Sequence, residues 1–235
     1  MRFNRKASVY HEKADIQKVV ADWSSEWIEC DCGGLRALEL GAGTGLFTKH
    51  LALRGFKSLL ATDQSKRMLE EGKKRLPMVE WHELDAWRCE TFLVDRIYAS
   101  SLLQWALNPE AVLENWRNAL EPEGRVLVCL FVAGSLGEFV KERPDFSALV
   151  WRSETEWLGF FRDAGFEISR NEVRDDIISY ASSREALRAI HDVGAVGERR
   201  MSTGELRRFL NDCDLRSKNR FELSWKTLRI ECVKR

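Results

Sequence analysis

Short apolar runs alternate with stretches of helical periodicity along most of this chain. The first run, at residues 35–40, ends in a glycine-rich turn at 41–45, and the helical stretch after it closes at Gly55. Strands that alternate with helices typically form a parallel, doubly wound sheet, so we predict an α/β fold with helices on both faces of the sheet. The seven predicted strands are residues 35–40, 57–63, 78–84, 95–100, 122–131, 166–173 and 222–233.

The helical stretches suggest one domain with two additions. Residues 3–29 contain no Gly or Pro and place apolar side chains at helical spacing, which predicts an N-terminal helical segment within 1–30. Two helices predicted between the last two strands suggest a helical lid over about 181–214 beside a substrate pocket. We therefore expect a single domain spanning 1–235. Its remaining predicted helices are 65–75, 109–120 and 153–165, besides the lid helices 182–192 and 203–212.

The composition excludes several classes of protein. Basic and acidic residues balance at 37 each, without the basic excess of a dedicated nucleic-acid-binding protein. The sequence contains no run of 18 apolar residues, and its first residues do not resemble a signal peptide. We therefore expect a cytoplasmic protein with no membrane or nucleic-acid partner. We also expect a monomer, although a sequence does not determine oligomeric state.

Cysteine and histidine spacings give no sign of a metal site. The 6 cysteines are scattered, with Cys30 and Cys32 as their closest pair, and the 4 histidines share no ligand spacing. We expect most of the cysteines to be small buried apolar residues, His11 to be a surface residue, and no metal to be bound.

A glycine-rich loop and two acids follow successive predicted strands. In Glu39-Leu-Gly41-Ala-Gly43-Thr-Gly45 the glycines allow the backbone to approach a ligand closely. Asp63 ends the second strand, where a carboxylate can accept two hydrogen bonds from a ribose diol, and Asp85 follows the third at the height of an adenine. A glycine loop alone is compatible with a simple strand–helix turn. Combined with acids at successive strand ends, it favours a nucleoside-containing ligand.

These residues resemble the class I S-adenosylmethionine-dependent methyltransferases, which share this loop, these acids and a turn before strand five like that at 120–124. The resemblance implies a Rossmann-like, seven-stranded, mostly parallel sheet with one antiparallel strand, and S-adenosylmethionine as cofactor. It implies that the glycine loop contacts the cofactor's methionine part, Asp63 its ribose, and Asp85 with Ala86 its adenine. The cofactor-binding residues implied in this way are Glu39, Gly41, Ala42, Gly43, Thr44, Gly45, Asp63, Gln64, Met68, Asp85, Ala86 and Ser100.

A narrower resemblance extends over nearly the whole chain. Short segments in matching order and spacing are similar to the malonyl-[acyl-carrier protein] O-methyltransferases of biotin synthesis. That family methylates the free carboxylate of a malonyl thioester so that fatty-acid synthesis can elongate it towards pimelate. A serine pair at 100–101 replaces the Ser-Asn often found in the family. The matching segments are 3–10, 14–17, 100–105, 133–136, 142–144 and 193–195.

The implied reaction suggests roles for several side chains. A malonyl carboxylate is ionised at neutral pH, so its methylation requires positioning and dehydration rather than a general base. Arg143 is the first candidate to hold that carboxylate, because a guanidinium can grip it with two parallel hydrogen bonds. Tyr10 is predicted to donate to the carboxylate or to lie near the sulfonium, and Trp105 to wall the acceptor pocket beside Gln104 as a possible substrate contact. A solvated arginine, a half-buried tyrosine and a core tryptophan are the alternatives.

The predicted partner is an acyl-carrier protein bearing a malonyl thioester. Acyl-carrier proteins are acidic, and the lid region contains a local group of arginines that matches them. Neutralisation of these arginines by neighbouring glutamates is the alternative reading. The predicted carrier-binding arginines are Arg184, Arg188, Arg199, Arg200, Arg207 and Arg208.

Three other functions remain open at this point. The same fold could methylate another small carboxylic acid or a quinone precursor, or the chain could be a cofactor-binding subunit without turnover. A nicotinamide-dependent dehydrogenase is disfavoured, since Leu46 occupies the position of the third glycine in the dinucleotide fingerprint.

Overall fold

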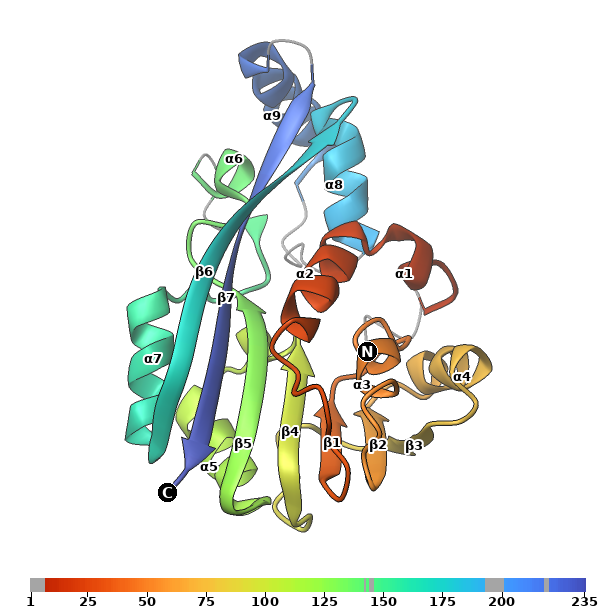
Figure 1. Cartoon of the computed structure of the whole chain (residues 1–235). Coiled ribbons are helices and arrows are strands. Elements are labelled where there is room, and N and C mark those ends of the chain that lie inside the picture. Colours follow the sequence, from red (N-terminus) through yellow and green to blue (C-terminus); the bar gives the residue numbers. More distant parts are fainter. Residues whose placement is uncertain (1–6, 142, 144–145, 193–200, 218–219) are drawn as a thin grey trace.

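A computed structural model of the protein describes residues 7–141, 143, 146–192, 201–217 and 220–235. The sheet has seven strands in the order β3-β2-β1-β4-β5-β7-β6, and β7 runs antiparallel to both of its neighbours (Figure 1). The predicted seven-stranded, mostly parallel α/β fold is therefore confirmed. The strands are β1 (Arg36–Leu40), β2 (Ser58–Asp63), β3 (Glu80–Glu83), β4 (Val94–Ser100), β5 (Leu120–Phe131), β6 (Phe166–Tyr180) and β7 (Phe221–Lys234).

Helices cover both faces of the sheet. One apolar cluster joins the sheet to α2 and to the pair α8 and α9, and a second joins it to α5 and α7. Local sequence explains several helix starts, because Ser153 and Ser202 each begin a capping box. The helices are α1 (Ala7–Lys13), α2 (Asp15–Ser25), α3 (Thr48–Leu51), α4 (Lys66–Arg75), η2 (Leu103–Trp105), α5 (Pro109–Asn118), α6 (Gly137–Val140), α7 (Glu154–Asp163), α8 (Ser183–Asp192) and α9 (Thr203–Arg216).

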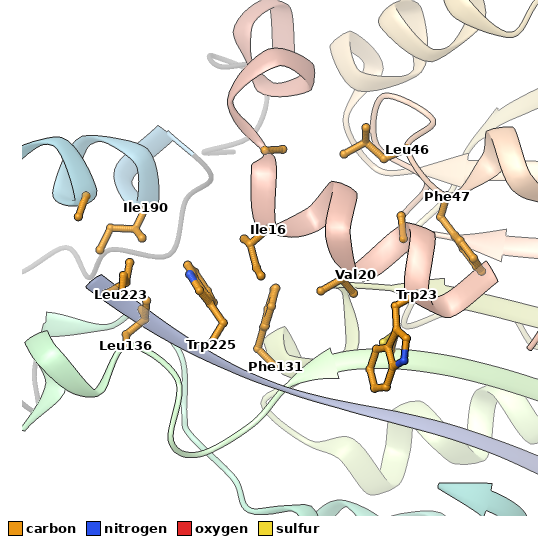
Figure 2. Packing of buried hydrophobic residues seen from close by; sticks show 14 of the residues in the cluster. Ile16, Val20, Trp23, Leu46, Phe47, Phe131, Leu136, Ile190, Leu223 and Trp225 are labelled. Atoms are coloured by element: carbon orange, nitrogen blue, oxygen red, sulfur yellow. The ribbon is translucent and has the colours of Figure 1, made fainter. Parts of the chain in front are cut away.

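The core on the α2 face ties the N-terminal helix to the C-terminal half of the chain. Figure 2 shows Ile16 of α2 beside Phe131, and Ile190 of α8 facing Leu223. Full burial of such side chains contributes roughly 1.5–3 kcal/mol each. The helices that carry Tyr10 and the arginines of α8 and α9 are therefore packed against one continuous core.

Arg229 of β7 fixes α2 to the sheet. Its guanidinium carbon lies 4.1 Å from the ring centre of Trp23 and 3.9 Å from that of Trp27, while its side chain is only 2% exposed. The guanidinium also donates to the backbone carbonyl of Trp23 and, at 2.6 Å, to Glu172. A buried cation stacked between two indoles is strongly held, so it anchors α2 in place.

Three predicted elements differ from the structure. The N-terminal helix predicted over 3–29 is divided into α1 and α2 at Ala14, whose φ and ψ are −86° and 54°. No Gly or Pro marks this break. It allows α2 to pack on the sheet while α1 contacts α4 and α8, so tertiary packing overrides the helical propensity.

The predicted boundaries of the other two elements are also wrong. The helix after the glycine loop is regular only over Thr48–Leu51, and the rest of 46–55 forms turns. β6 continues to Tyr180 instead of ending at residue 173. Its second half pairs with the first half of β7, and this two-stranded extension projects beyond the other strands to the α8 and α9 pair (Figure 1).

The cysteines agree with the predicted role. All 6 are free, and only Cys30 is exposed. Within the described ranges, no helix is long and apolar enough to cross a membrane.

Candidate active site

The glycine loop leaves its strand in a conformation that favours glycine. Gly41 and Gly43 have φ values of 68° and 57°, in the left-handed region. A Cβ on Gly41 would come within 2.7 Å of Leu102, whereas one on Gly43 would meet no atom within 4 Å. The loop backbone therefore faces open space at Gly43. A Cβ on Gly45, which is also predicted to contact the cofactor, would come within 3.1 Å of Leu76 and 3.3 Å of Trp81.

Asp63 holds this loop from the end of β2. Its Oδ2 accepts a hydrogen bond from the Gly43 amide at 3.0 Å, and its Oδ1 accepts one from the Ser65 amide at 2.7 Å. Burial raises the pKa of the carboxyl, and these two amide donors oppose that rise. Each carboxylate oxygen has a further lone pair for the hydroxyls of a ribose.

One cavity brings together most of the predicted cofactor-binding residues, with Tyr10 and Trp105. It is lined from the carboxyl ends of β1, β2 and β4, from the segment after β3, and from α1 (Figure 1). Four of its lining residues were not predicted: Leu84, Trp87, Ser101 and Leu102. The predicted residues that line it are Tyr10, Gly41, Gly43, Asp63, Gln64, Met68, Asp85, Ala86, Ser100 and Trp105.

The end of the cavity beyond β3 suits a purine base. Asp85 is exposed there and accepts a hydrogen bond from the Trp87 amide at 3.1 Å. The Ala86 carbonyl is held by the Trp116 indole at 2.7 Å, which fixes this segment against the core. Met68 and Leu84 add apolar walls. Apolar walls with a carboxylate beside them can bind an adenine and accept a hydrogen bond from its amino group.

A second chamber beside the glycine loop contains unpaired buried acceptors. Glu39, Gln17 and Ser101 all line it, and Glu39 Oε2, Gln17 Oε1 and Ser101 Oγ have no hydrogen-bond partner within the described ranges. Burial raises the pKa of Glu39 to about 8. An ammonium group has three N–H donors and no acceptor, so the amino-acid part of S-adenosylmethionine would satisfy these atoms. The residues present therefore fit the cofactor.

Gln17 is a site residue that sequence analysis missed. It lies on the buried face of α2 and is only 8% exposed, between the core residues Ile16 and Val20. A buried polar side chain within an apolar helical face usually has a partner to satisfy. The position of this glutamine within the apolar pattern of 16–23 was the available signal.

Tyr10 lines both chambers from α1. Burial, followed by the charge of Asp63, raises the pKa of its phenol well above the usual value, so Tyr10 stays neutral and able to donate. The neighbouring His11 Nδ1 lies 3.0 Å from Thr44 Oγ1, and burial together with nearby cations lowers the pKa of His11. His11 was predicted to be a surface residue, but it links α1 to the glycine loop.

Two predicted acceptor-side residues, Trp105 and Gln104, and three predicted cofactor-binding residues, Ser100, Thr44 and Ala42, lie in different places. Trp105 and Ser100 line the cofactor cavity. Gln104 is buried, donates to the Ser101 carbonyl at 2.8 Å, and is absent from the cavity lining. Thr44 is 1% exposed in the second chamber, and Ala42, also in that chamber, donates its amide to the Thr62 carbonyl at 2.8 Å.

Arg143 lies elsewhere. It lines a separate cavity together with Arg184, Arg188 and Arg207, so the structure does not bring it together with Tyr10 and Trp105. Arg208 is exposed on α9 outside that lining. Arg199 and Arg200 fall outside the described residues.

Comparisons with known proteins indicate a methyltransferase. A family model described as a methyltransferase domain matches residues 38–126, from β1 into β5. The malonyl-[acyl-carrier protein] O-methyltransferase of Halorhodospira halophila is 27% identical over 236 residues, covering 95% of this chain and 79% of that protein. The biotin biosynthesis bifunctional protein BioHC of Cellvibrio japonicus is 28% identical over 139 residues, or 58% of this chain but only 28% of that larger protein.

A solved structure shows the same fold. Magnesium protoporphyrin IX methyltransferase from Synechocystis PCC 6803, with bound SAH, superposes with a TM-score of 0.62 at 14% identity, covering 97% of this chain and 88% of that one. Together, the sheet order, the glycine loop with Asp63, and these matches define the class. The chain has the fold of the class I S-adenosylmethionine-dependent methyltransferases, and its residues 38–126 match a methyltransferase domain. Within that class, malonyl-[acyl-carrier protein] O-methyltransferases are among the curated proteins that it resembles over most of its length.

We expect cofactor binding to displace a proton from Glu39. With its pKa near 8, Glu39 is mostly protonated in the cofactor-free protein at neutral pH, whereas a nearby ammonium favours the ionised form. Affinity for S-adenosylmethionine should therefore rise with pH up to about pH 8, where the cofactor-free protein itself loses this proton, by at most roughly tenfold per unit. Calorimetry in buffers of different ionisation enthalpy measures the proton released. Proton uptake, or a dissociation constant independent of pH, would contradict this role.

The raised pKa of Glu39 also determines how the stability of the cofactor-free protein changes with pH. The unfolded chain loses the Glu39 proton near the ordinary value of 4.5, while the folded chain keeps it to about 8. The cofactor-free protein therefore loses stability from this group as pH rises across that interval. Glu39→Gln should remove this contribution to the pH dependence and also the proton release, which makes it the matched control.

Gln17→Leu is expected to separate cofactor binding from stability. The leucine fills a similar volume but offers no acceptor, so we expect about a tenfold rise in the dissociation constant for S-adenosylmethionine. The thermal midpoint of the cofactor-free protein should stay the same or rise, since a buried carbonyl without a partner is removed. A fall in the midpoint with unchanged affinity would show that Gln17 is only a packing residue.

Proposed function

We propose that the protein transfers the methyl group of S-adenosylmethionine to the free carboxylate of a malonyl group held as a thioester on an acyl-carrier protein. The product would be the methyl ester from which a pimeloyl chain is built in biotin synthesis. The observation that supports this most is the extent of the similarity. The alignment with the Halorhodospira halophila enzyme covers 95% of the chain, so it includes the acceptor side and the α8 and α9 pair as well as the cofactor loop.

The chemistry of the site is compatible with a carboxylate acceptor. The cofactor, when bound, supplies an electrophilic methyl group on a sulfonium. A malonyl carboxylate is already ionised at neutral pH, so no side chain has to remove a proton. The protein therefore has to position the acceptor carboxylate, to exclude water, and to stabilise the carboxylate until its charge and that of the sulfonium neutralise each other.

Tyr10 and Trp105 are the residues that we assign to this work. Burial keeps the Tyr10 phenol protonated, so its hydroxyl can donate a hydrogen bond to an acceptor carboxylate. Trp105 and Leu102 form an apolar wall on the same cavity. A desolvated carboxylate is a stronger nucleophile than a hydrated one, and an apolar wall favours that state.

A series of acceptors tests the proposal. Radiolabelled S-adenosylmethionine is offered with malonyl-carrier protein, a malonyl thioester of pantetheine, free malonate, and carrier without an acyl group. We expect base-labile label on the malonyl carrier at much higher kcat/KM than on the short thioester, and none on the unacylated carrier. Efficient labelling of free malonate would instead indicate a small-acid methyltransferase, and cofactor binding without any transfer would indicate another acceptor.

A further inference from the structure

A second cavity, of about 580 Å³, lies between α8, α9 and the segment after α6. Four arginines line it: Arg143, Arg184, Arg188 and Arg207. The apolar part of its lining, which we call its floor, consists of Phe146, Leu187, Met201, Leu206 and Leu210. Cationic walls over an apolar floor suit a ligand that has both an anionic group and an apolar chain.

Three of the four arginines that line this cavity, Arg184, Arg188 and Arg207, are not paired with the acids beside them among the described residues. Glu185 accepts a hydrogen bond from the Ala181 amide at 2.7 Å, and Glu205 closes the capping box with Ser202. Electrostatically, Glu205 faces Arg143 and Arg208. Within the described ranges, Arg184, Arg188 and Arg207 form no ion pair, so their guanidinium groups are available to an external anion.

The place of the cavity relates it to methyl transfer. The α8 and α9 pair lies beyond the carboxyl ends of the parallel strands (Figure 1), and residues at the ends of β1, β2 and β4 line the cofactor cavity. α1, which contributes Tyr10 to the cofactor cavity, contacts α8 directly. A long ligand anchored at the arginines can therefore extend along α1 towards the cofactor.

We propose that this cavity binds the phosphate and the adjoining apolar part of the phosphopantetheine arm on which an acyl group is presented. The inference rests on the proposed function, since it concerns how the malonyl acceptor is held. Three guanidiniums match the phosphate, and the apolar floor matches the methyl-bearing part of the arm. Recognition of the arm differs from contact with the acidic carrier surface, because it needs a cavity and is retained by small substrates.

The test compares two small thioesters that differ only in phosphate, malonyl-phosphopantetheine and malonyl-pantetheine. We expect a KM at least tenfold lower for the phosphorylated thioester, with the same kcat. Arg184→Ser and Arg207→Ser should each remove most of that difference without changing KM for malonyl-pantetheine. Arg162→Ser, an exposed position on α7 at the other face of the sheet, should leave both KM values unchanged.

Arg208→Ser tests whether the preference for the phosphorylated thioester comes from the cavity or from the overall positive charge of α9. Arg208 is next to Arg207 but does not line the cavity, so we expect it to retain the phosphate preference. Equal losses for Arg207→Ser and Arg208→Ser, or equal KM values for the two thioesters in the unmodified protein, would overturn the proposal.

A binding measurement separates this inference from the proposed function. Titration of phosphopantetheine without an acyl group, followed by calorimetry, requires no methyl transfer. Binding that is lost in Arg207→Ser, together with absence of malonyl methylation, would support the arm site and reject the proposed acceptor. Methylation of malonyl-carrier protein without measurable phosphopantetheine binding would support the proposed acceptor and reject the arm site. Malonyl-coenzyme A presents the same arm, and its comparison with the carrier shows which source of the arm is preferred.

Discussion

Asp63→Ala is expected to raise the dissociation constant for S-adenosylmethionine by about 100-fold, because two hydrogen bonds from a ribose to a charged group are lost. The structure adds a second effect. Asp63 also accepts from the amides of Gly43 and Ser65, so its removal releases the glycine loop and leaves two amides without a partner. Calorimetric titration measures the affinity for S-adenosylmethionine. The thermal midpoint of the cofactor-free protein measures the stability lost when the glycine loop is released.

Asp63→Asn provides the matched control. The amide oxygen can still accept from one backbone amide, but its NH₂ group faces the other N–H and cannot accept from a ribose hydroxyl. We expect a smaller loss of stability than in the alanine variant and a similarly large loss of affinity. Unchanged affinity in both variants would exclude Asp63 from the cofactor site.

Arg229→Met is expected to lower the free energy of unfolding by about 3 kcal/mol, which corresponds to a fall of about 6–12 °C in Tm for a domain of this size. The side chain is 2% exposed and stacks between Trp23 and Trp27. The partners Glu26 and Glu172 are 63% and 50% exposed, so they return to water when the arginine is removed. The loss therefore comes mainly from the stacking and from the hydrogen bond to the Trp23 carbonyl.

Arg235→Ser is the comparison for this prediction. Arg235 also pairs with two carboxylates, Glu123 and Glu167, at 2.7 and 2.6 Å, but its side chain is 57% exposed. Exposed ion pairs contribute about 0–1 kcal/mol, so denaturant unfolding should show a much smaller change. A loss in Arg229→Met no greater than that in Arg235→Ser would show that the stacked arginine is not an anchor. Because Arg229 fixes α2, its replacement should also weaken cofactor binding through Gln17.

The cofactor half of the fold could be predicted from the sequence because its signals are local. Gly43, Asp63 and Asp85 lie at or just after the ends of three short strands, and parallel strands place such residues at one edge of the sheet. The capping box at Ser153 is equally local, and it marks the start of α7 correctly.

The remaining features depend on contacts between distant segments. The break at Ala14 arises because α1 and α2 pack against different elements, and nothing in 7–25 marks it. The second half of β6 has a mostly polar sequence without alternation, and its partner is Phe221–Thr227, more than 40 residues later along the chain. Arg143 follows β5, whose carboxyl end lies on the cofactor side of the sheet. Because α6 lies between β5 and Arg143, Arg143 is placed beside the α8 and α9 pair.

The most direct test of the proposed function is the mass of malonyl-carrier protein before and after incubation with this protein and S-adenosylmethionine. We predict a gain of one methylene mass, located by fragmentation on the distal carboxylate of the malonyl group, and no gain on the carrier without an acyl group. An unchanged carrier mass, in a sample where cofactor binding has been demonstrated by titration, would contradict the proposed reaction.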